Sequence, residues 1–309
     1  MTAAVPVVDV HAHVVVPGLG AEVRRDERGQ VVFLGGREIR SAIREFVDVA
    51  RIVEEQDRAG VDAAVVCPWV NLLGRDPERQ NEALASMVGK RVAALGTVDP
   101  EQPEQLEELM RDGRLSGVEV PAALGGDYLG AKRFRAFWAA AEETGALVFV
   151  HPTTRGFDTP VMSEHYLWNT VGNPFETTLA AAHMVGAGVL DEHPRLKVLL
   201  AHGGGAVVAL RGRLAHEQTF RGPGRDVLGV LRRFYVDTVV HDVDVLRSIV
   251  DFWGSDHVLC GSDYPFDMGT ERPAEIVRAL ALAPDAEAAI LGGNALRLLD
   301  RARVAGASA

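Results

Sequence analysis

The chain has 309 residues, 47% of them apolar and 24% charged, and these proportions predict a globular protein with a sizeable core. Its formal net charge of −11 argues against nucleic acid as a partner, because phosphates require a basic face. No apolar run reaches the ~20 residues that span a bilayer. The start also lacks the basic segment of a signal peptide. We therefore expect no membrane partner and a cytoplasmic location.

Apolar strand-like runs alternate with helix-length amphipathic runs along the chain. The expected strands are Val5–His13, Ala63–Cys67, Val92–Val98, Gly117–Pro121, Leu147–His151, Val198–His202, Phe234–Val239 and Val258–Asp263. The expected helices are Val47–Ala59, Pro77–Gly89, Gln102–Asp112, Lys132–Thr144, Phe175–Val185, Ala206–Thr219, Val243–Trp253 and Arg272–Ala281. Eight strand–helix units predict one α/β domain over residues 1–309, closed as a (β/α)8 TIM barrel. A doubly wound open sheet is the competing architecture, but no Gly-x-Gly-x-x-Gly follows the first strand.

Two stretches interrupt this alternation, each after a strand. Val14–Glu45 is polar and Gly-rich, and it predicts a small insertion with a β-hairpin over Arg24–Leu34. Arg155–Pro174 is a loop insertion after the fifth strand. Because a barrel builds its active site at the carboxyl ends of its strands, both stretches are candidates for a lid or pocket wall. Asn294–Ala309 predicts a last short helix with a frayed end.

The first strand ends in a His-x-His pair, His11 and His13. Residues two apart in a strand point to the same face, so both imidazoles can hold one ion. The fifth, sixth and eighth strands end in His151, His202 and Asp263. Strand ends converge on one mouth of a closed barrel, so these five side chains should meet.

Three neutral imidazoles and one carboxylate suit a divalent ion such as Zn²⁺. We assign His11, His13, His151 and Asp263 as the ligands, with water in the remaining position. His202 is then free as an acid or base beside the water, and an imidazole titrates near neutral pH. Taken singly, His202 could begin a helix, Asp263 could be an N-cap and His151 could be a core histidine. Their joint occurrence at four strand ends favours the metal site.

Other conspicuous residue types get structural interpretations. Two cysteines far apart in apolar runs, Cys67 and Cys260, predict buried thiols rather than a disulfide. His241, at the end of the seventh strand, is left open between a structural role and contact with a metal ligand. The histidines interpreted as structural are His165, His183, His193, His216 and His257.

A family resemblance rests on strings that span nearly the whole chain. They are Asp9-Val-His11-Ala-His13, Phe149-Val-His151-Pro, Asn173-Pro-Phe-Glu-Thr-Thr, Ala201-His202-Gly-Gly-Gly, Tyr235-Val-Asp-Thr-Val-Val-His-Asp and Gly261-Ser-Asp263-Tyr-Pro-Phe. With these the chain resembles the amidohydrolase superfamily (amidohydrolase 2 family), in the branch of aminocarboxymuconate-semialdehyde decarboxylase. The first string marks the superfamily, and the later ones are more specific to the branch.

The resemblance implies a metal-dependent, non-oxidative decarboxylase acting on an unsaturated or aromatic carboxylic acid. The usual ion is Zn²⁺, with Mn²⁺ an alternative. His11, His13, His151 and Asp263 match the ligands, and His202 matches the catalytic histidine. The proton donor to carbon is His202, or Asp263 relays it. The fourth strand, Gly117–Pro121, supplies no lysine for a carbamylated bridge, so the site should be mononuclear.

The resemblance also implies substrate-binding residues. Arg40 aligns with the arginine that binds the substrate carboxylate, and Arg213 with one contributed across a homodimer interface. Solvent-facing roles are the alternative for both arginines. Phe266 matches an aromatic of the pocket wall, and Trp168 is the other aromatic that we expect to bind the substrate. The chain departs from the family where Asn169 replaces a tryptophan, with Trp168 one position away, and this puts the exact substrate in doubt.

Two other classes of function remain open on the same scaffold. The first is metal-dependent hydrolysis of an ester, lactone, amide or carbon–carbon bond, or a related hydration. The second is a metal-binding protein without catalysis. Release of CO₂ without consumption of water would discriminate a decarboxylase from a hydrolase.

Overall fold

The structure is a computed structural model, and it describes residues 5–16, 18–26, 29–34, 36–39, 49–153, 160–221 and 224–299. Its strands are β1 (Val8–Val14), β2 (Ala21–Asp26), β3 (Gly29–Leu34), β4 (Arg37–Ile39), β5 (Ala63–Pro68), β6 (Val92–Ala94), β7 (Gly117–Pro121), β8 (Ala123–Leu124), β9 (Asp127–Tyr128), β10 (Leu147–His151), β11 (Lys197–Leu200), β12 (Tyr235–Asp237) and β13 (Val258–Leu259).

The α-helices are α1 (Val49–Ala59), α2 (Pro77–Met87), α3 (Pro103–Asp112), α4 (Arg135–Thr144), α5 (Asn173–Gly186), α6 (Val189–Glu192), α7 (Val207–Arg221), α8 (Val227–Leu231), α9 (Val243–Trp253), α10 (Pro273–Arg278), α11 (Pro284–Ala288) and α12 (Asn294–Leu298). Short 3₁₀ or π turns are η1 (Val70–Leu72), η2 (Lys132–Phe134), η4 (Pro160–Ser163), η5 (Trp168–Gly172), η6 (His202–Gly204) and η7 (Ala289–Gly293).

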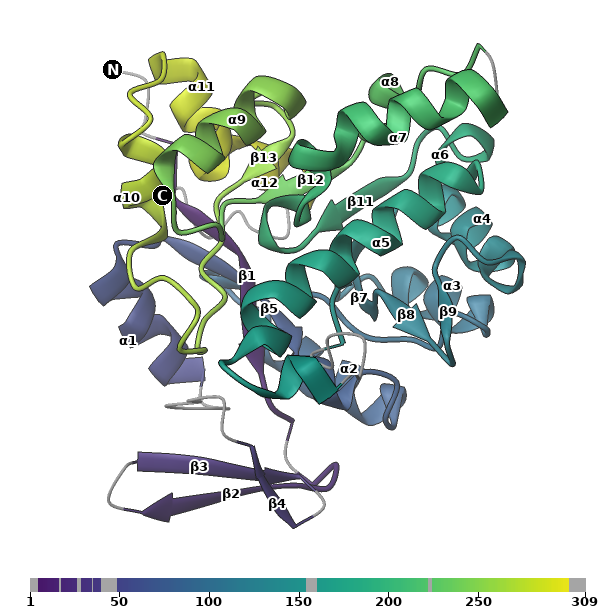
Figure 1. Cartoon of the computed structure of the whole chain (residues 1–309). Helices are drawn as coiled ribbons and strands as arrows, with labels where there is room; N and C mark the ends of the chain where they lie inside the picture. The colour runs from purple at the N-terminus through teal and green to yellow at the C-terminus, as the bar shows by residue number, and fades with distance from the viewer. Residues whose placement is uncertain are drawn as a thin grey trace.

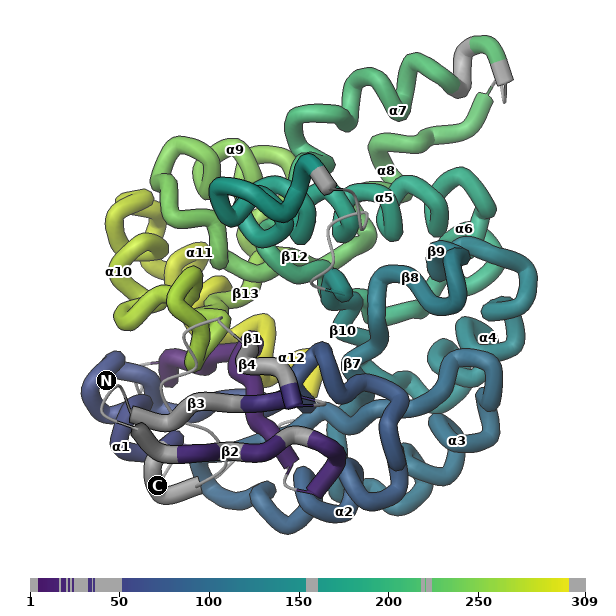
Figure 2. Tube along the Cα trace, turned by 60° about the horizontal axis from the view of Figure 1, so that its bottom comes forward, coloured from purple at the N-terminus to yellow at the C-terminus, as the bar shows by residue number. Residues whose placement is uncertain are grey.

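Eight parallel strands form the centre of the molecule, in two hydrogen-bonded sheets of order β1-β5-β6 and β13-β12-β11-β10-β7. A bridge between Gly96 and Val118 joins β6 to β7. At the other edge a bridge between Ala12 and Tyr264 joins β1 to the segment after β13. The expected (β/α)8 barrel is therefore confirmed. Figure 2 shows the strands around the centre, with α2, α3, α4, α9 and α10 outside them.

The strands are apolar on both faces because each face packs on a different core. Side chains such as Val10, Val65, Phe149 and Leu199 fill the barrel interior, and Leu298 of α12 packs into the same interior cluster. The larger cluster lies between the outer faces of the strands and the helices around them. This packing leaves the carboxyl ends of the strands for polar residues.

Two expected strand ends are wrong in a way that matters for the site. His202 and Asp263 lie beyond β11 and β13, which end at Leu200 and Leu259. Both have a left-handed backbone, with φ of 55° and 59°. Because such residues cannot continue a strand, their side chains are aimed by loops rather than by the strand pleat. The other expected elements match to within a few residues. β1 begins at Val8 rather than Val5, and β6 ends at Ala94 rather than Val98.

The expected hairpin over Arg24–Leu34 is confirmed as part of an antiparallel sheet of β2, β3 and β4, which lies apart from the barrel strands (Figure 1). The small β8–β9 ribbon was not expected. After β10, residues 154–159 lie outside the described part, and η4 and η5 then precede α5. The expected last helix is present as α12, while the tail from residue 300 is outside the described residues.

Both cysteines are free and buried, as expected. Among the helices that the structure describes, none is long and apolar enough to cross a membrane.

Candidate metal centre

Four predicted ligands meet above the barrel interior. One nitrogen or oxygen from each of His11, His13, His151 and Asp263 lies within 4.8 Å of the others, and all four residues are buried. His11 Nε2 is 3.0 Å from His13 Nε2 and 3.2 Å from Asp263 Oδ1. His13 Nε2 is 3.4 Å from the same oxygen. The strand tips therefore converge as the sequence predicts.

A β-bulge brings the first two ligands into the barrel. The pairing of β1 with β5 shifts between Asp9 and Ala12. Val10 below the bulge faces the interior, and so does His11, whose ring contacts Phe149 at 4.8 Å. The Asp9 carboxylate stabilises the bulge, because it accepts the backbone N–H of His11 and hydrogen bonds from Ser262. An extra residue in the strand thus sets which face carries the ligands.

Each ligand histidine has an acceptor on its other ring nitrogen. His11 Nδ1 lies 2.7 Å from Asp237 Oδ2. His13 Nδ1 lies 3.2 Å from the Pro68 carbonyl oxygen, and His151 Nδ1 lies 2.9 Å from that of Pro152. A proton on each Nδ1 satisfies these acceptors and leaves the Nε2 lone pair free, as a metal ligand requires.

The charges of the cluster fit a cation. Burial alone would lower the pKa of His11, but the nearby Asp263 carboxylate and the hydrogen bond to Asp237 raise it well above its ordinary value. Burial would raise the pKa of Asp263, but His11 holds it well below its usual range. His151 Nε2 and Asp263 Oδ1 are buried without a hydrogen bond. A divalent ion can bind buried nitrogen and oxygen atoms that lack hydrogen-bond partners, and it also neutralises a buried carboxylate. These residues therefore fit a divalent metal ion.

His202 lies beside the cluster without being part of it. Its Nε2 is 3.5 Å from Asp263 Oδ2, while its ring centroid is 5.3 Å from that of His151. Its side chain is 13% exposed, more than any of the four ligands. A partly accessible imidazole next to a ligand carboxylate is placed to exchange protons with a bound molecule.

Sequence reasoning missed three buried carboxyl groups near the centre. Asp9 and Asp237 make the contacts above, and Glu119 of β7 lies 3.7 Å from His13 Nδ1 and 3.9 Å from His151 Nδ1. Burial raises the pKa of Glu119 well above its ordinary value, which favours its neutral form. Asp9 and Asp237 stand within the family strings, and the charged residue in the apolar run of β7 is the signal that could have found Glu119. His241 does not reach the cluster. Its Nε2 is 2.7 Å from the Met268 carbonyl oxygen.

The predicted substrate-binding residues have different surroundings. The Phe266 ring lies 5.3 Å from that of His13, at the edge of the cluster. Trp168 packs edge-on against Tyr166 at 4.9 Å, and the Tyr166 hydroxyl donates to Asp267. Arg213 is exposed on α7 and is not part of the cluster in this chain. Arg40 lies outside the described residues.

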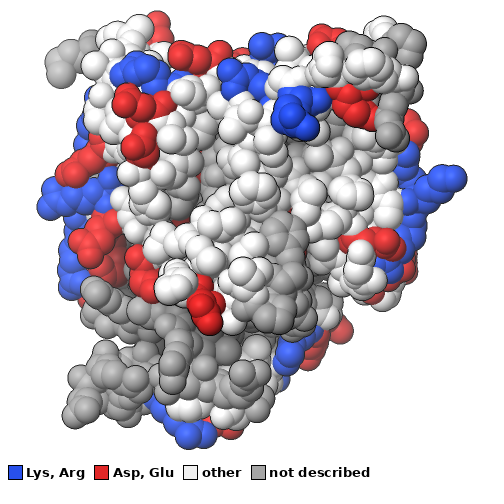
Figure 3. Space-filling model, in the orientation of Figure 1, with Lys and Arg blue, Asp and Glu red and all other residues white. Residues whose placement is uncertain are grey.

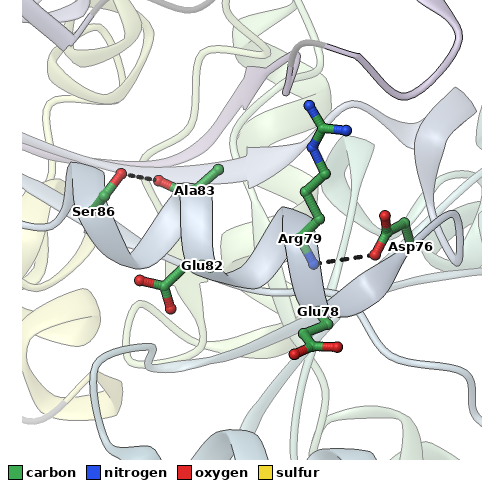
Figure 4. A pocket seen from close by; sticks show the side chains of 6 residues that line it. All are labelled: Asp76, Glu78, Arg79, Glu82, Ala83 and Ser86. Atoms are coloured by element: carbon green, nitrogen blue, oxygen red, sulfur yellow. Dashed lines mark hydrogen bonds between the residues drawn. The ribbon is translucent and has the colours of Figure 1, made fainter.

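Two surface hollows are lined neither by the four candidate ligands nor by His202. One of about 550 Å³ runs along α2, where Asp76 accepts the N–H of Arg79 and the Ser86 hydroxyl donates to the carbonyl of Ala83 (Figure 4). Its lining is the solvent-facing side of one helix. The other, of about 610 Å³, lies between α1 and residues 262–272. Neither hollow is lined by the metal cluster.

The barrel and the cluster define this chain as a metal-site protein of the (β/α)8 class. A family model described as Amidohydrolase matches residues 8–301. The chain belongs to the amidohydrolase family.

Curated relatives in this family are decarboxylases. The 2-amino-3-carboxymuconate-6-semialdehyde decarboxylase of Dictyostelium discoideum is 32% identical over 234 residues, which cover 71% of this chain and 65% of that protein. The 6-methylsalicylic acid decarboxylase of Penicillium expansum is 33% identical over 147 residues, or 46% of this chain and 45% of that protein. The chain thus matches less than two thirds of the length of either relative.

Solved structures share the fold at low identity. The 5-carboxyvanillate decarboxylase of Sphingomonas paucimobilis has a TM-score of 0.79 and 22% identity, covering 96% of this chain and 99% of that one. A dihydroxybenzoic acid decarboxylase of a Polaromonas species, solved with manganese and the inhibitor 2-nitroresorcinol, has a TM-score of 0.80 and 18% identity, covering 97% and 98%. These likenesses support the barrel fold.

Proposed function

We propose that the chain is a metal-dependent, non-oxidative decarboxylase of an unsaturated or aromatic carboxylic acid. The observation that carries the proposal is the buried three-histidine, one-aspartate cluster with a fifth imidazole, His202, 3.5 Å from the ligand carboxylate. The names of the curated relatives support the reaction class.

The four ligands would hold one divalent ion, Zn²⁺ in our proposal. When bound, such an ion attracts electrons from substrate oxygens and makes a water at its open position more acidic. Two structural neighbours were solved with manganese, so Mn²⁺ belongs in every test.

The remaining steps fall to the side chains around the ion. Arg40 and Arg213 bind the substrate carboxylate, and Phe266 and Trp168 wall the apolar part of the substrate. His202 Nε2 holds the proton that the substrate carbon takes up. The bond from that carbon to the carboxylate breaks, its electron pair stays on the carbon with the new proton, and CO₂ leaves. Atoms and charge balance without an oxidant.

The test is CO₂ release. Purified protein is stripped with chelator, reloaded with Zn²⁺ or Mn²⁺, and supplied with a panel of aromatic and muconate-type acids. We expect metal-dependent release of one CO₂ per acid consumed. A product that gains water and retains its carboxylate would contradict decarboxylation and indicate a hydrolase.

His202→Ala should retain the metal and lower kcat by a factor of about 10² or more, because it removes the proton carrier and none of the ligands. His193→Ala is the matched control, since His193 interacts with Glu142 away from the cluster. Metal analysis and kcat are measured for both variants. If His202→Ala loses its metal, His202 is a ligand and its proposed role is wrong.

The acting form in our proposal is a homodimer in which Arg213 reaches the site of the partner subunit. Arg213 is exposed on α7, which packs beside α5. Figure 3 shows charged side chains mainly around the rim of this face and a largely uncharged centre over α5. Two apolar side chains of η5 and α5, Val171 and Phe175, are 37% and 42% exposed. Such a patch is typical of an interface.

Subunit mixing tests the contribution across the interface. Arg213→Ala and His202→Ala are each expected to be nearly inactive. Refolded together, they should regain about one quarter of wild-type activity, because half of the dimers are mixed and each has one intact site. Light scattering measures the mass of each species. A monomeric mass, or a mixture no more active than its parts, would contradict the proposal.

The free thiols support our further proposal of a cytoplasmic location.

A further inference from the structure

Asp237 is a buried carboxylate at the end of β12, shared by two parts of the candidate centre. Its two oxygens meet four hydrogen-bond donors. Oδ2 is 2.7 Å from His11 Nδ1 and 2.9 Å from the backbone nitrogen of His202. Oδ1 accepts the backbone N–H groups of Gly203, at 2.8 Å, and Val239, at 3.0 Å. Asp237 is 0% exposed, so these donors replace water entirely.

On the side of the ligands, Asp237 fixes the orientation of His11. Because the carboxylate accepts at Nδ1, the proton of the neutral imidazole stays there and Nε2 points toward His13 and Asp263. An acceptor at this position therefore decides whether His11 can act as a ligand.

On the other side, Asp237 holds the chain corner that presents His202. His202 and Gly203 both have left-handed φ, of 55° and 62°. This conformation is uncommon for a residue with a Cβ. The backbone N–H groups of both residues donate hydrogen bonds to the Asp237 carboxylate. The corner is also tightly packed, since a Cβ at Gly203 would lie 2.5 Å from Val240 Cγ1 and 2.7 Å from Ile249 Cδ1.

We propose that Asp237 is a positioning residue that couples His11 to His202. It sets the ring orientation of the ligand His11 and the backbone conformation at the proton carrier His202. This inference rests on the proposed function for the roles of those two histidines. The Asp237 carboxylate aligns both histidines, so that metal binding and turnover depend on the same group.

Asp237→Asn is the decisive variant, because it keeps the size of the side chain and changes one atom. The amide oxygen can still accept from Gly203 and Val239. The amide NH₂ then faces two donors, the His202 N–H and His11 Nδ1–H. It favours the His11 tautomer with the proton on Nε2, where the metal must bind. We expect metal affinity to fall about 10- to 100-fold, a range typical of partners of metal-ligating histidines. At saturating metal, kcat should still be low, with KM little changed.

Gly203→Ala separates the two roles. It crowds the corner and leaves the bond between Asp237 and His11 in place, so kcat should fall while metal affinity stays within about twofold of wild type. Asp242→Asn is the matched control. Asp242 is an exposed carboxylate five residues away that accepts the N–H of Val245, and its variant should leave both quantities unchanged.

Metal affinity is measured by chelator competition, and the ligand geometry from the visible spectrum of the Co²⁺-loaded protein. Neither readout needs turnover. If wild-type protein releases no CO₂ from any acid but Asp237→Asn still loses metal affinity, the hold on His11 stands and the decarboxylase proposal fails. Wild-type affinity, Co²⁺ spectrum and kcat in Asp237→Asn would overturn the inference.

A measurement on the wild-type protein covers the case in which the variant does not fold. Histidine ¹⁵N–¹H spectra of the metal-loaded protein should show the His11 proton on Nδ1. A His11 Nδ1 without a proton would overturn the inference.

Discussion

Asp9, Glu119 and Asp237 are buried side chains of the barrel strands, and their surroundings shift their pKa values in different directions. Burial raises the pKa of Asp9 to about 6, partly offset by hydrogen bonds from Ser262 and His11. Burial also raises the pKa of Glu119 well above its ordinary value. Burial also acts on Asp237, but the hydrogen bond and charge of His11 leave its pKa below the ordinary value. Burial thus raises the pKa of Asp9 and Glu119, whereas the contact with His11 lowers that of Asp237.

These residues mark the limit of prediction from sequence at the scale of single residues. His11, His13, His151 and Asp263 could be predicted because each stands at or shortly after the carboxyl end of a barrel strand, and such an end is visible as the end of an apolar run. A residue that orients a ligand has no fixed spacing from it. Asp237 is 226 residues from His11, so only the folded chain brings them together.

The buried thiols give a prediction at this scale. Burial raises the pKa of Cys67 and of Cys260 above the ordinary value for a thiol. The thiolate is the reactive form, so both residues should be inert toward a thiol reagent in the native protein. Absorbance with Ellman's reagent should show almost no reaction before unfolding and two thiols per chain in denaturant. Rapid reaction of either thiol in the native protein would contradict their burial.

At the scale of elements, the contact between η6 and α5 depends on Gly205. This residue has φ of 63°, and a Cβ there would lie 2.0 Å from the Pro174 carbonyl oxygen and 2.7 Å from Thr178 Oγ1. Thr178 Oγ1 also accepts the N–H of Ala206, next to the start of α7. The glycine therefore lets the loop after β11 lie directly on the first turns of α5.

Gly205→Ala should lower the free energy of unfolding by about 2 kcal/mol or more, because it adds backbone strain and a clash. Gly212→Ala is the opposite case. Gly212 is exposed within α7, and a Cβ there meets nothing within 4 Å, so the change should stabilise the helix by up to ~1 kcal/mol. Urea midpoints of the two variants and wild type measure the difference. Equal midpoints would rule out the close approach at Gly205.

The periodicity of the sequence predicted the elements well and their ends less well. Helix starts follow local signals. For example, Asp242 accepts the N–H of Val245 at the start of α9, and the expected bounds of that helix match. The ends of β11 and β13 could not be predicted in this way. Their apolar runs continue past the last paired residue, and positive φ at His202 and Asp263 has no signature in an apolar pattern.

At the scale of the whole molecule, the ring closes where β1 meets the segment after β13. Backbone hydrogen bonds cross this seam from Val10 N–H to the Cys260 carbonyl, at 2.9 Å, and from Asp263 N–H to the His11 carbonyl, at 2.7 Å. The candidate metal centre lies across the same seam, because it joins His11 and His13 to Asp263. A bound ion would therefore link the first strand to the last.

Metal should stabilise the barrel as a whole. An ion at about 1,000 times its dissociation constant adds ~4 kcal/mol to the free energy of unfolding, provided that it does not bind the unfolded chain. For a chain of this size the unfolding midpoint should rise by roughly 10 °C. Scanning calorimetry with and without Zn²⁺ or Mn²⁺ measures the shift, and Asp263→Asn should abolish it. An equal shift in that variant would mean that the ion binds elsewhere.

The ligands are unevenly distributed along the chain, with two at positions 11 and 13, one at 151 and the last at 263. On the ribosome, the histidine pair emerges early, whereas the one candidate ligand carboxylate, Asp263, follows only after most of the polypeptide has been made. A nascent chain that ends before Asp263 has only three of the four candidate ligands, and its first strand has no partner at the seam. We therefore expect the complete four-ligand site to form only after synthesis of the eighth strand.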